Sequence, residues 1–271
     1  MIDRFGRTID YLRIAVTDRC NLRCVYCMPS EGINLMRHDD VLRFEEIVDV
    51  ARAAVNIGVR KIRLTGGEPL VRLGVESLVA QLAAIDSVAD LAMTTNGVLL
   101  PKYAPLLAEA GLHRVNVSLD AIDAERYAAL TRGGDVREVL AGIEAARKAG
   151  LEPVKLNCVL SPKNRDAEGI TPDAHDVEAF AKREGLEVRF IEQMDLAGGH
   201  FSVVHGGSGG DCRRCNRLRL TSDGQIRPCL FSDLSFSVRK LGAAEAIAQA
   251  IAQKPSSGST CSDRTISMIG G

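Results

Sequence analysis

Along this chain, stretches in which hydrophobic and polar residues alternate with a period of two are separated by stretches with helical periodicity. Short β-branched runs with a period of two predict strands at residues 11–17, 61–66, 91–96, 114–120, 153–160 and 187–194. Between these runs, apolar residues recur at helical spacing in residues 45–58, 74–86, 135–150 and 176–185. Six repeats of strand and helix predict a parallel sheet with crossover helices, which is an α/β architecture.

The two faces of the predicted strands differ in character. One face carries aliphatic side chains such as Leu12, Ile14 and Leu64, which should pack under helices. The other face is polar in all six strands and carries Arg13, Lys61, Arg63, Thr94, Asn96, Asn116, Ser118, Asp120, Lys155, Asn157 and Arg189. A closed barrel normally fills its interior with branched apolar side chains. The polar inner face therefore predicts an open barrel whose lumen holds a large anionic ligand, since arginine binds phosphate oxygens bidentately.

Composition narrows the class of protein. The chain has 271 residues, of which 46% are hydrophobic, so it can bury a full-sized core. A formal net charge of −1 gives no bulk attraction to nucleic acid or to an anionic membrane, so neither is expected as a partner. No apolar run is long enough for a signal peptide or a membrane span, which predicts a cytoplasmic location. Thiols stay reduced there, so the eight cysteines are interpreted as metal ligands or catalytic groups.

Six of the cysteines form two triads. Cys20, Cys24 and Cys27 have the spacing C-x3-C-x2-C, and the second triad, C-x2-C-x13-C, consists of Cys212, Cys215 and Cys229. A structural zinc site is normally closed by four ligands, and a [4Fe–4S] cluster is usually held by four thiolates. Three thiolates leave one iron open to a small molecule, so the first triad predicts a cluster that takes a substrate or cofactor.

The second triad leaves two interpretations open. It can hold another open cluster, or a zinc ion with His200 or His205 as fourth ligand. Cys158 and Cys261 have no partner at ligand spacing and are left out of both sites.

Two shorter motifs stand beside these features. Arg217 and Arg219 follow Cys215 directly and would place phosphate-binding groups next to the second triad. Gly66 and Gly67, in GGEP at the end of the second predicted strand, indicate a point where the backbone approaches something closely.

Taken together, these motifs resemble the radical S-adenosylmethionine (SAM) superfamily, and within it the GTP 3′,8-cyclase family. The resemblance rests on RFGRTIDYLRIAVTDRCNLRCVYCMP, KIRLTGGEPLVR, TTNG, RVNVSLDA, VRFIEQM, CRRCNRLRLTSDGQIRPCLF and the terminal MIGG. It implies an incomplete (βα)6 barrel of the radical SAM type with a small C-terminal iron–sulfur domain. It also implies a cytoplasmic lyase that opens molybdenum cofactor biosynthesis. In this reaction a 5′-deoxyadenosyl radical abstracts the ribose C3′ hydrogen of GTP, and C3′ then closes onto guanine C8.

The resemblance also implies roles for individual residues. Two [4Fe–4S] clusters would be held by Cys20, Cys24 and Cys27 and by Cys212, Cys215 and Cys229, and SAM would be bound by Tyr26, Gly67, Ser118 and Met194. GTP would contact Arg13, Lys61, Arg63, Thr94, Lys155, Arg217, Leu218 and Arg219. Catalysis would involve Arg13, Arg63, Arg189, Arg217, Arg219, Gly270 and Gly271. The partners implied are GTP, a reductant protein of flavodoxin or ferredoxin type, the downstream cyclic pyranopterin monophosphate synthase and, for a homodimer, a second copy of the chain.

One segment departs from the family pattern. Residues 195–211, between the sixth strand and the second triad, are short and rich in glycine, where the family has a longer segment. The predicted division is a barrel at residues 1–196 and a shortened C-terminal domain at residues 197–271. Other functions stay open: a sibling radical SAM enzyme acting on another phosphorylated nucleotide, a pterin or a peptide, and a non-catalytic iron–sulfur carrier or zinc scaffold.

Overall fold

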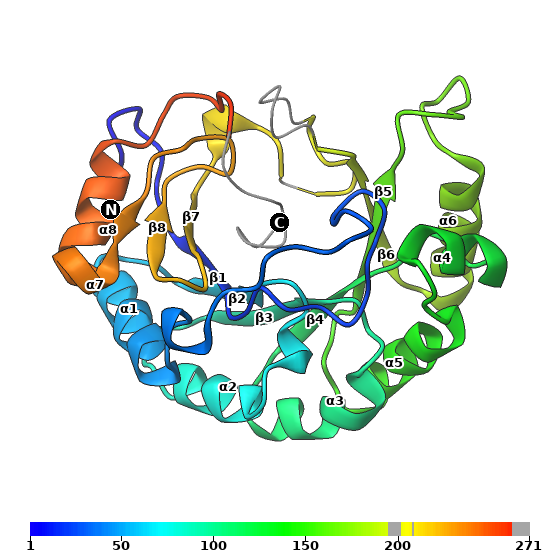
Figure 1. The fold of residues 1–271 in the computed structure, drawn as a ribbon, viewed down its shortest axis with the longest axis horizontal. Helices are drawn as coiled ribbons and strands as arrows, with labels where there is room; N and C mark the ends of the chain where they lie inside the picture. The colour runs from blue at the N-terminus through cyan, green and yellow to red at the C-terminus, as the bar shows by residue number, and fades with distance from the viewer. Residues whose placement is uncertain (195–201, 208, 262–271) are drawn as a thin grey trace.

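The computed structural model describes residues 1–194, 202–207 and 209–261, and the strands of these residues form one curved sheet (Figure 1). The strand order is β6-β5-β4-β3-β2-β1-β7-β8-β9, in which the run from β6 to β7 is parallel and β8 and β9 are antiparallel. The strands are β1 (Tyr11–Ala15), β2 (Lys61–Thr65), β3 (Asp90–Thr95), β4 (Arg114–Ser118), β5 (Lys155–Leu160), β6 (Glu187–Glu192), β7 (Arg217–Leu220), β8 (Gln225–Arg227) and β9 (Phe236–Ser237). Within the described residues β6 and β9 are the edges, so the barrel is open, as the sequence predicts.

Helices follow the parallel strands and cover the outer face of the sheet (Figure 1). They are α1 (Phe44–Asn56), α2 (Val75–Ala83), α3 (Leu100–Glu109), α4 (Ala124–Thr131), α5 (Val136–Lys148), α6 (Pro172–Glu184), α7 (Val238–Leu241) and α8 (Ala243–Ala252), with short 3-10 turns η1 (His38–Asp40), η2 (Pro69–Val71) and η3 (Cys212–Arg214). The four predicted helices and six predicted strands are confirmed, with ends shifted by a few residues. The pattern does not indicate α3, because Pro105 lies in its interior, whereas Pro101 is in its first turn, where proline is tolerated; tertiary packing overrides the local preference against Pro105.

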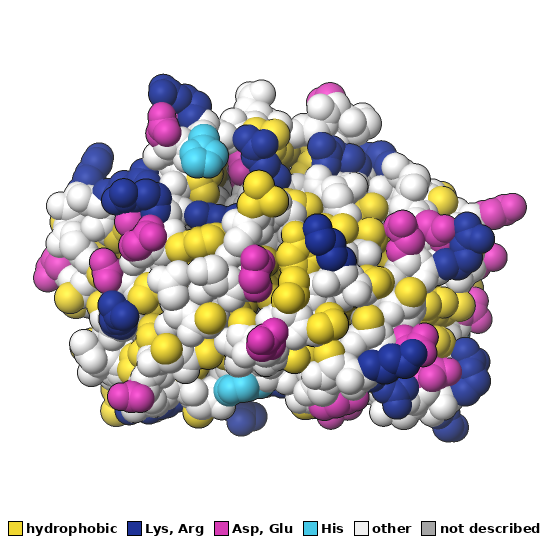
Figure 2. Space-filling view, turned by 90° about the horizontal axis from the view of Figure 1, so that it is seen from below, with side chains coloured by type: hydrophobic (Ala, Val, Ile, Leu, Met, Phe, Trp, Pro, Cys, Tyr) yellow, Lys and Arg dark blue, Asp and Glu magenta, His cyan; other side chains and the backbone are white. Residues whose placement is uncertain are grey.

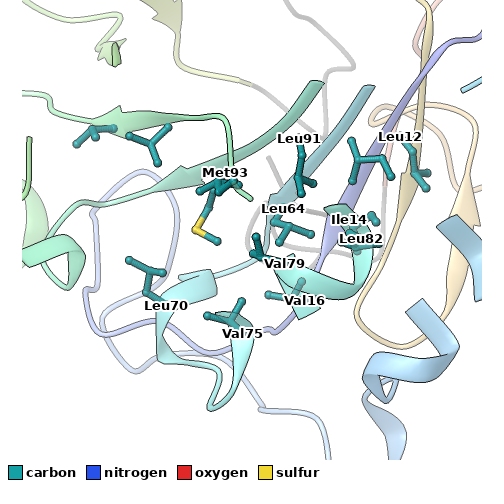
Figure 3. Packing of buried hydrophobic residues seen from close by; sticks show 14 of the residues in the cluster. Leu12, Ile14, Val16, Leu64, Leu70, Val75, Val79, Leu82, Leu91 and Met93 are labelled. Carbon is teal, nitrogen blue, oxygen red and sulfur yellow. The ribbon is translucent and has the colours of Figure 1, made fainter. Parts of the chain in front are cut away.

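The hydrophobic core lies between the outer face of the sheet and the helices. Leu12 and Ile14 of β1 and Leu64 of β2 are fully buried against Val79 and Leu82 of α2 (Figure 3). This is the aliphatic face that the alternation predicts, so the polar face of the same strands is turned toward the lumen. Truncating one of these leucines to alanine would cost about 2–5 kcal/mol of folding free energy.

The residues after 201 continue the same sheet. β7 pairs with β1 in parallel, with Tyr11 opposite Arg217 and Arg13 opposite Arg219. The division into domains at residues 196 and 197 stays a prediction, but the chain beyond it contributes strands beside β1 rather than a separate sheet. The pairing brings Arg217 and Arg219 beside the arginines of β1 and β2.

In the described part of the chain, no helix has the length and apolar composition needed to cross a bilayer. Figure 2 shows one outer face, on which acidic and basic side chains are interspersed among hydrophobic ones.

Candidate active site

The first cysteine triad lies on the loop that leaves the carboxyl end of β1. Two glycines let this loop pack against the end of β2: a Cβ on Gly66 would lie 2.4 Å from the carbonyl oxygen of Thr17, and one on Gly67 would lie 2.3 Å from that of Arg19. The amides of Gly67 and Glu68 donate to the same two carbonyls at 2.9 and 2.8 Å. The close approach predicted for this glycine pair is therefore made to the backbone leading into Cys20.

The other side of the loop is attached to β4 and α4. The Tyr26 hydroxyl donates to Oδ2 of Asp120 at 2.6 Å, and the Val25 amide donates to the Leu130 carbonyl at 2.9 Å. The guanidinium of Arg132 donates to the carbonyls of Arg23 and Met28, each at 2.7 Å. The loop is thus held at both ends, and its three sulfurs are positioned by β1, β2 and β4.

The three cysteines of this loop are free and half-buried. The pKa of the Cys24 thiol is raised to about 12, mainly by burial and in addition by the nearby Asp120, Cys27 and Cys20, whose charges disfavour a thiolate there. The Leu22 amide and the Asn96 side chain donate to Sγ of Cys20 at 3.4 and 3.9 Å. Three neighbouring thiols on one loop, with N–H donors aimed at the sulfur of Cys20, fit a cluster bound through three thiolates.

Glu68, the acid of GGEP, is a buried carboxyl beside this loop. It accepts from Thr95 Oγ1 at 2.7 Å and from the amides of Asn96 and Leu70 at 2.6 and 3.1 Å. Burial is the largest influence and raises the pKa of Glu68 to about 7, against the lowering effect of these donors. The carboxyl joins the ends of β2 and β3 at the first triad.

Stability is expected to depend on pH through Glu68. Its pKa is raised from the ordinary 4.5 to about 7 in the folded chain. Between these two pH values the folded state keeps a proton on Glu68 that the unfolded state has lost. The free energy of unfolding therefore falls as the pH rises from 4.5 to 7. The full loss is about 3 kcal/mol. We expect the Glu68→Gln variant to lack this loss of stability. Urea unfolding of the metal-free protein at pH 5, 6 and 7.5 should therefore show that the free energy of unfolding falls more in the wild type than in the variant. Parallel curves would contradict this, and the exposed Glu125→Gln is the matched control.

The second triad surrounds a small cavity at the amino end of β7. Cys212 and Cys215 flank η3, Cys229 follows β8, and all three line a cavity of about 170 Å³ together with Arg217 and Arg219. Burial raises the pKa of the Cys215 thiol, but the cations Lys254, Arg217 and Arg219 outweigh it and the net pKa is lowered. A positive environment of this kind suits an anionic cluster.

The zinc alternative for this triad has no support in the described residues. His205 forms a backbone bridge with Phe190 and does not line the cavity, and His200 lies outside the described residues. Among the residues with described positions, no three His, Cys, Asp or Glu side chains are placed to hold a single metal ion. Cys158 is buried in the core and Cys261 packs with Leu230 and Phe231, outside both triads.

Polar side chains of all seven parallel strands, β1 to β7, surround a cavity of about 300 Å³, here called the lumen cavity. Its charged lining residues are Arg13, Lys61, Arg63, Asp90, Arg114, Arg189, Arg217 and Arg219. Among the described residues that line it, the single acid, Asp90, is bound to Arg114 at 2.5 and 2.9 Å. The buried Nε of Arg63, Nε of Arg189 and Nδ2 of Asn116 have no hydrogen-bond partner among the described residues. The lumen cavity is therefore a site for a polyanion.

The cations of this cavity repel one another. The pKa of Arg13 is lowered to about 9, mainly by burial and in addition by the charges of Arg219, Arg63 and Arg217. The pKa of Arg219 is lowered to about 10 by burial and by the charge of Arg217. A bound polyanion would relieve this repulsion, because oppositely charged oxygens restore the preference of each guanidinium for its charged form.

Some lining residues were missed by the sequence analysis. The Tyr11 ring lies under two guanidiniums, with centroid distances of 5.8 Å to Arg63 and 5.9 Å to Arg217. Arg114 belongs to the polar face of β4. The alternation that identifies Arg13 and Asn116 also places Tyr11 and Arg114 on the lumen face, so the signal was present in the sequence.

Apart from Met194, the remaining residues predicted to bind GTP or SAM and described by the structure lie outside the lining of the lumen cavity. Lys155 forms an ion pair with Glu187, and Thr94 accepts from Arg63 Nη1 at 3.5 Å. Leu218 is fully buried in the core, in register with Leu12, so its side chain faces away from the lumen. Of the predicted SAM residues, Met194 lines the lumen cavity, Tyr26 and Gly67 lie on or against the cysteine loop, and Ser118 ends β4. Gly270 and Gly271 lie outside the described residues.

Comparison with known proteins gives consistent results. Residues 14–170 match the radical SAM superfamily. The chain is 42% identical over 290 residues to a protein named GTP 3′,8-cyclase from Thermodesulfovibrio yellowstonii, covering 89% of this chain and 88% of that protein. It is 43% identical over 308 residues to one of the same name from Moorella thermoacetica, covering 94% of each. With a third, from Alkaliphilus oremlandii, it is 39% identical over 325 aligned residues that cover 100% of each chain. Since this chain has 271 residues, about 54 of those positions face gaps, consistent with the short segment 195–211.

Solved structures share the fold at low sequence identity. Streptococcus suis SuiB bound to the precursor peptide SuiA has a TM-score of 0.68 at 14% identity, with 92% of this chain and 65% of that chain covered. Native anSMEcpe with bound AdoMet has a TM-score of 0.61 at 16% identity, with 91% and 81% covered.

Proposed function

The chain belongs to the GTP 3′,8-cyclase family of the radical SAM superfamily, and on this premise we propose that its lumen cavity binds GTP for cyclisation between ribose C3′ and guanine C8. It is an enzyme of the radical SAM type, with SAM and a [4Fe–4S] cluster as its cofactors. The product is (8S)-3′,8-cyclo-7,8-dihydroguanosine 5′-triphosphate, a precursor in molybdenum cofactor biosynthesis.

Cys20, Cys24 and Cys27 would hold the first cluster. When bound, this cluster and SAM would supply a 5′-deoxyadenosyl radical that takes the C3′ hydrogen of GTP. C3′ would then bond to C8, and one further electron from the reductant, with a proton, would complete the 7,8-dihydroguanosine. The chain's own part is to position the reactants and keep water away from them. For SAM we propose contacts with Tyr26, Gly67, Ser118 and Met194.

The observation that carries the proposal is the placement of the cations between two cysteine triads. The first triad follows the carboxyl end of β1, and Cys215 precedes β7, whose first residue lies opposite the first residue of β1. The triads thus lie beyond opposite ends of β1, a strand whose five residues span roughly 16 Å. Arg13, Arg63 and Arg219 project between them. A nucleoside triphosphate placed there meets arginines along its phosphates, with a sulfur-rich site at each end.

We propose that Cys212, Cys215 and Cys229, which line one cavity, would hold a second [4Fe–4S] cluster whose fourth iron could bind the guanine of GTP. Arg13, Arg63, Arg189, Arg217 and Arg219 would bind the triphosphate, with Lys61 and Asn116 at its margins. Thr94 and Lys155, bonded to Arg63 and Glu187, would act through those neighbours, and Leu218 through the position of β7. Gly270 and Gly271 would extend the active site from the carboxyl terminus.

We further propose a reductant protein of flavodoxin or ferredoxin type as electron donor, and a cyclic pyranopterin monophosphate synthase as the enzyme that consumes the product. All eight cysteines are free, which suits the reducing conditions of the cytoplasm. A homodimer is part of the same proposal. The carrier and scaffold hypotheses do not agree with membership of an enzyme family, and the cationic lumen disfavours a peptide substrate.

The proposed reaction predicts two products that appear together. We expect anaerobic protein reconstituted with iron and sulfide, then given SAM, GTP and dithionite, to form 5′-deoxyadenosine and cyclised GTP in equal amounts, measured by mass spectrometry. Deoxyadenosine without cyclised GTP would retain the radical chemistry and overturn GTP as substrate. Omission of GTP is the control for uncoupled SAM cleavage.

A further inference from the structure

A buried lysine from the end of the C-terminal helix lies against the second triad. Lys254, two residues beyond the end of α8, is 1% exposed. Its Nζ donates to the Arg217 carbonyl at 2.7 Å and to the Pro228 carbonyl, and Cys215 is near enough for its sulfur to interact with the ammonium. An ammonium has three N–H donors, so two are used by the carbonyls and one is left that can point to the sulfur.

The partners of Lys254 come from both halves of the triad. The Arg217 carbonyl lies two residues after Cys215, and the Pro228 carbonyl belongs to the residue before Cys229. One ammonium therefore ties the strand that follows the C-x2-C pair to the segment that carries the third cysteine. A side chain that met only one of these segments could not fix the distance between them.

The neighbouring Arg7 holds the remaining cysteine but contributes little free charge. Its guanidinium donates to the Cys212 carbonyl at 2.8 Å and to the Pro255 carbonyl at 2.7 Å, next to Lys254. Arg7 is also bound to the buried carboxylate of Asp3 at 2.6 Å, so its charge is compensated. In the described part of the chain no carboxylate lies within ion-pair distance of Lys254. Its charge is thus directed at the triad.

The two triads have differently charged neighbours. Asp120, a buried carboxylate, is bonded to Tyr26 on the loop of the first triad. Arg217 and Arg219 line the cavity of the second triad, and Lys254 is bonded to carbonyls on both of its segments. The potential of an iron–sulfur cluster depends on nearby charge and on hydrogen bonds to its sulfurs, and a cation with an N–H···S bond favours the reduced, more negative form.

We propose that Lys254 is a positioning residue of the second iron–sulfur centre: it sets the spacing of Cys215 and Cys229 and raises the reduction potential of the cluster they hold. The inference rests on the proposed second cluster. The proposed role of Lys254 would make the second centre differ from the first through one residue, and this residue lies far from both triads in the sequence.

The test isolates the second centre in the full-length chain. In a parent variant with Cys20, Cys24 and Cys27 all replaced by alanine, Lys254→Met removes the charge and both hydrogen bonds to carbonyls, and Lys254→Gln keeps N–H donors without the charge. Lys240→Met is the matched control, since it removes an exposed lysine near α8 that does not contact the triad. After anaerobic reconstitution, the measurements are iron and sulfide content, the rate of iron loss to a chelator, and the midpoint potential by titration followed with electron paramagnetic resonance.

We expect both Lys254 variants to lose iron about tenfold faster or more, in line with the effect of removing a supporting contact of a metal ligand. Their potentials should be more negative than that of the parent, whereas Lys240→Met should match the parent in both. A purely structural role would leave the potential of Lys254→Gln unchanged, and that result would overturn the proposal. A parent that binds no cluster would overturn the second centre itself, while equal retention and potential in all variants would overturn the role of Lys254 alone.

Discussion

Replacing Cys24 with alanine is expected to abolish SAM cleavage and GTP cyclisation together, with a loss of at least about a thousandfold. The reason is that Cys24 is the central ligand of the first triad, and two thiolates on a loop do not hold a cluster that requires three. Iron content should fall by about half, because each triad would hold one four-iron cluster. The measurements are 5′-deoxyadenosine by mass spectrometry and iron per chain.

The matched control is Cys158→Ala, which removes a fully buried cysteine of β5 that lies outside both triads. This variant should keep its iron and form both products. If Cys24→Ala still formed deoxyadenosine at the wild-type rate, the first triad would not be the site of SAM chemistry. A loss of the helical circular dichroism signal would show instead that the variant had unfolded.

Arg219→Met is expected to stabilise the metal-free protein while weakening GTP binding about a hundredfold. Arg219 is 8% exposed, and its pKa is lowered from 12.5 to about 10, first by burial and then by Arg217. Because the folded state disfavours its charged form, the charge opposes folding at every pH below about 10. Its removal should raise the free energy of unfolding by about 1–3 kcal/mol, measured in urea at pH 7. The same charge binds phosphate, so its loss should cost about 3 kcal/mol of GTP affinity.

Calorimetric titration of the reconstituted enzyme with GTP measures the second effect. SAM cleavage without cyclisation should persist, because Arg219 lines the lumen cavity and the cavity of the second triad and is not on the loop of the first triad. Arg137→Met is the control, since Arg137 is largely exposed and is paired with Asp135 beside it. Unchanged GTP affinity in Arg219→Met would contradict a phosphate-binding role for the lumen cavity. A destabilised apo protein would show that repulsion among the arginines is weaker than their contacts.

The alternation of the strands predicted the two faces of the sheet because it is a local property: successive side chains of a strand must point in opposite directions. Arg13, Arg63 and Asn116 were placed on the lumen face in this way, and the structure confirms them there. Tyr11 and Arg114 obey the same rule and could have been found. The helix at residues 100–109 could not, because Pro105 in its interior opposes a helix locally and tertiary packing overrides that opposition.

Residue types in close sequence spacing also predicted the cysteine sites. Cys20, Cys24 and Cys27 lie within one loop, so their proximity follows from chain connectivity, and the missing fourth ligand is visible in the count. The assignment of individual GTP contacts was less direct. Lys155 carries a lumen-type charge in the sequence, but in the fold it pairs with Glu187, its neighbour across β5 and β6.

The sequence by itself determined the strand–helix alternation, the polar inner face and the two cysteine triads, since each depends on residues that are close along the chain. Only the tertiary structure decided how these parts meet. The pairing of β1 with β7 brings Arg219 beside Arg13 across about 200 residues, and the end of α8 carries Lys254 to Cys215. No local period encodes such contacts, because they arise when distant segments bury their apolar faces in one core and the polar groups left between them must find partners.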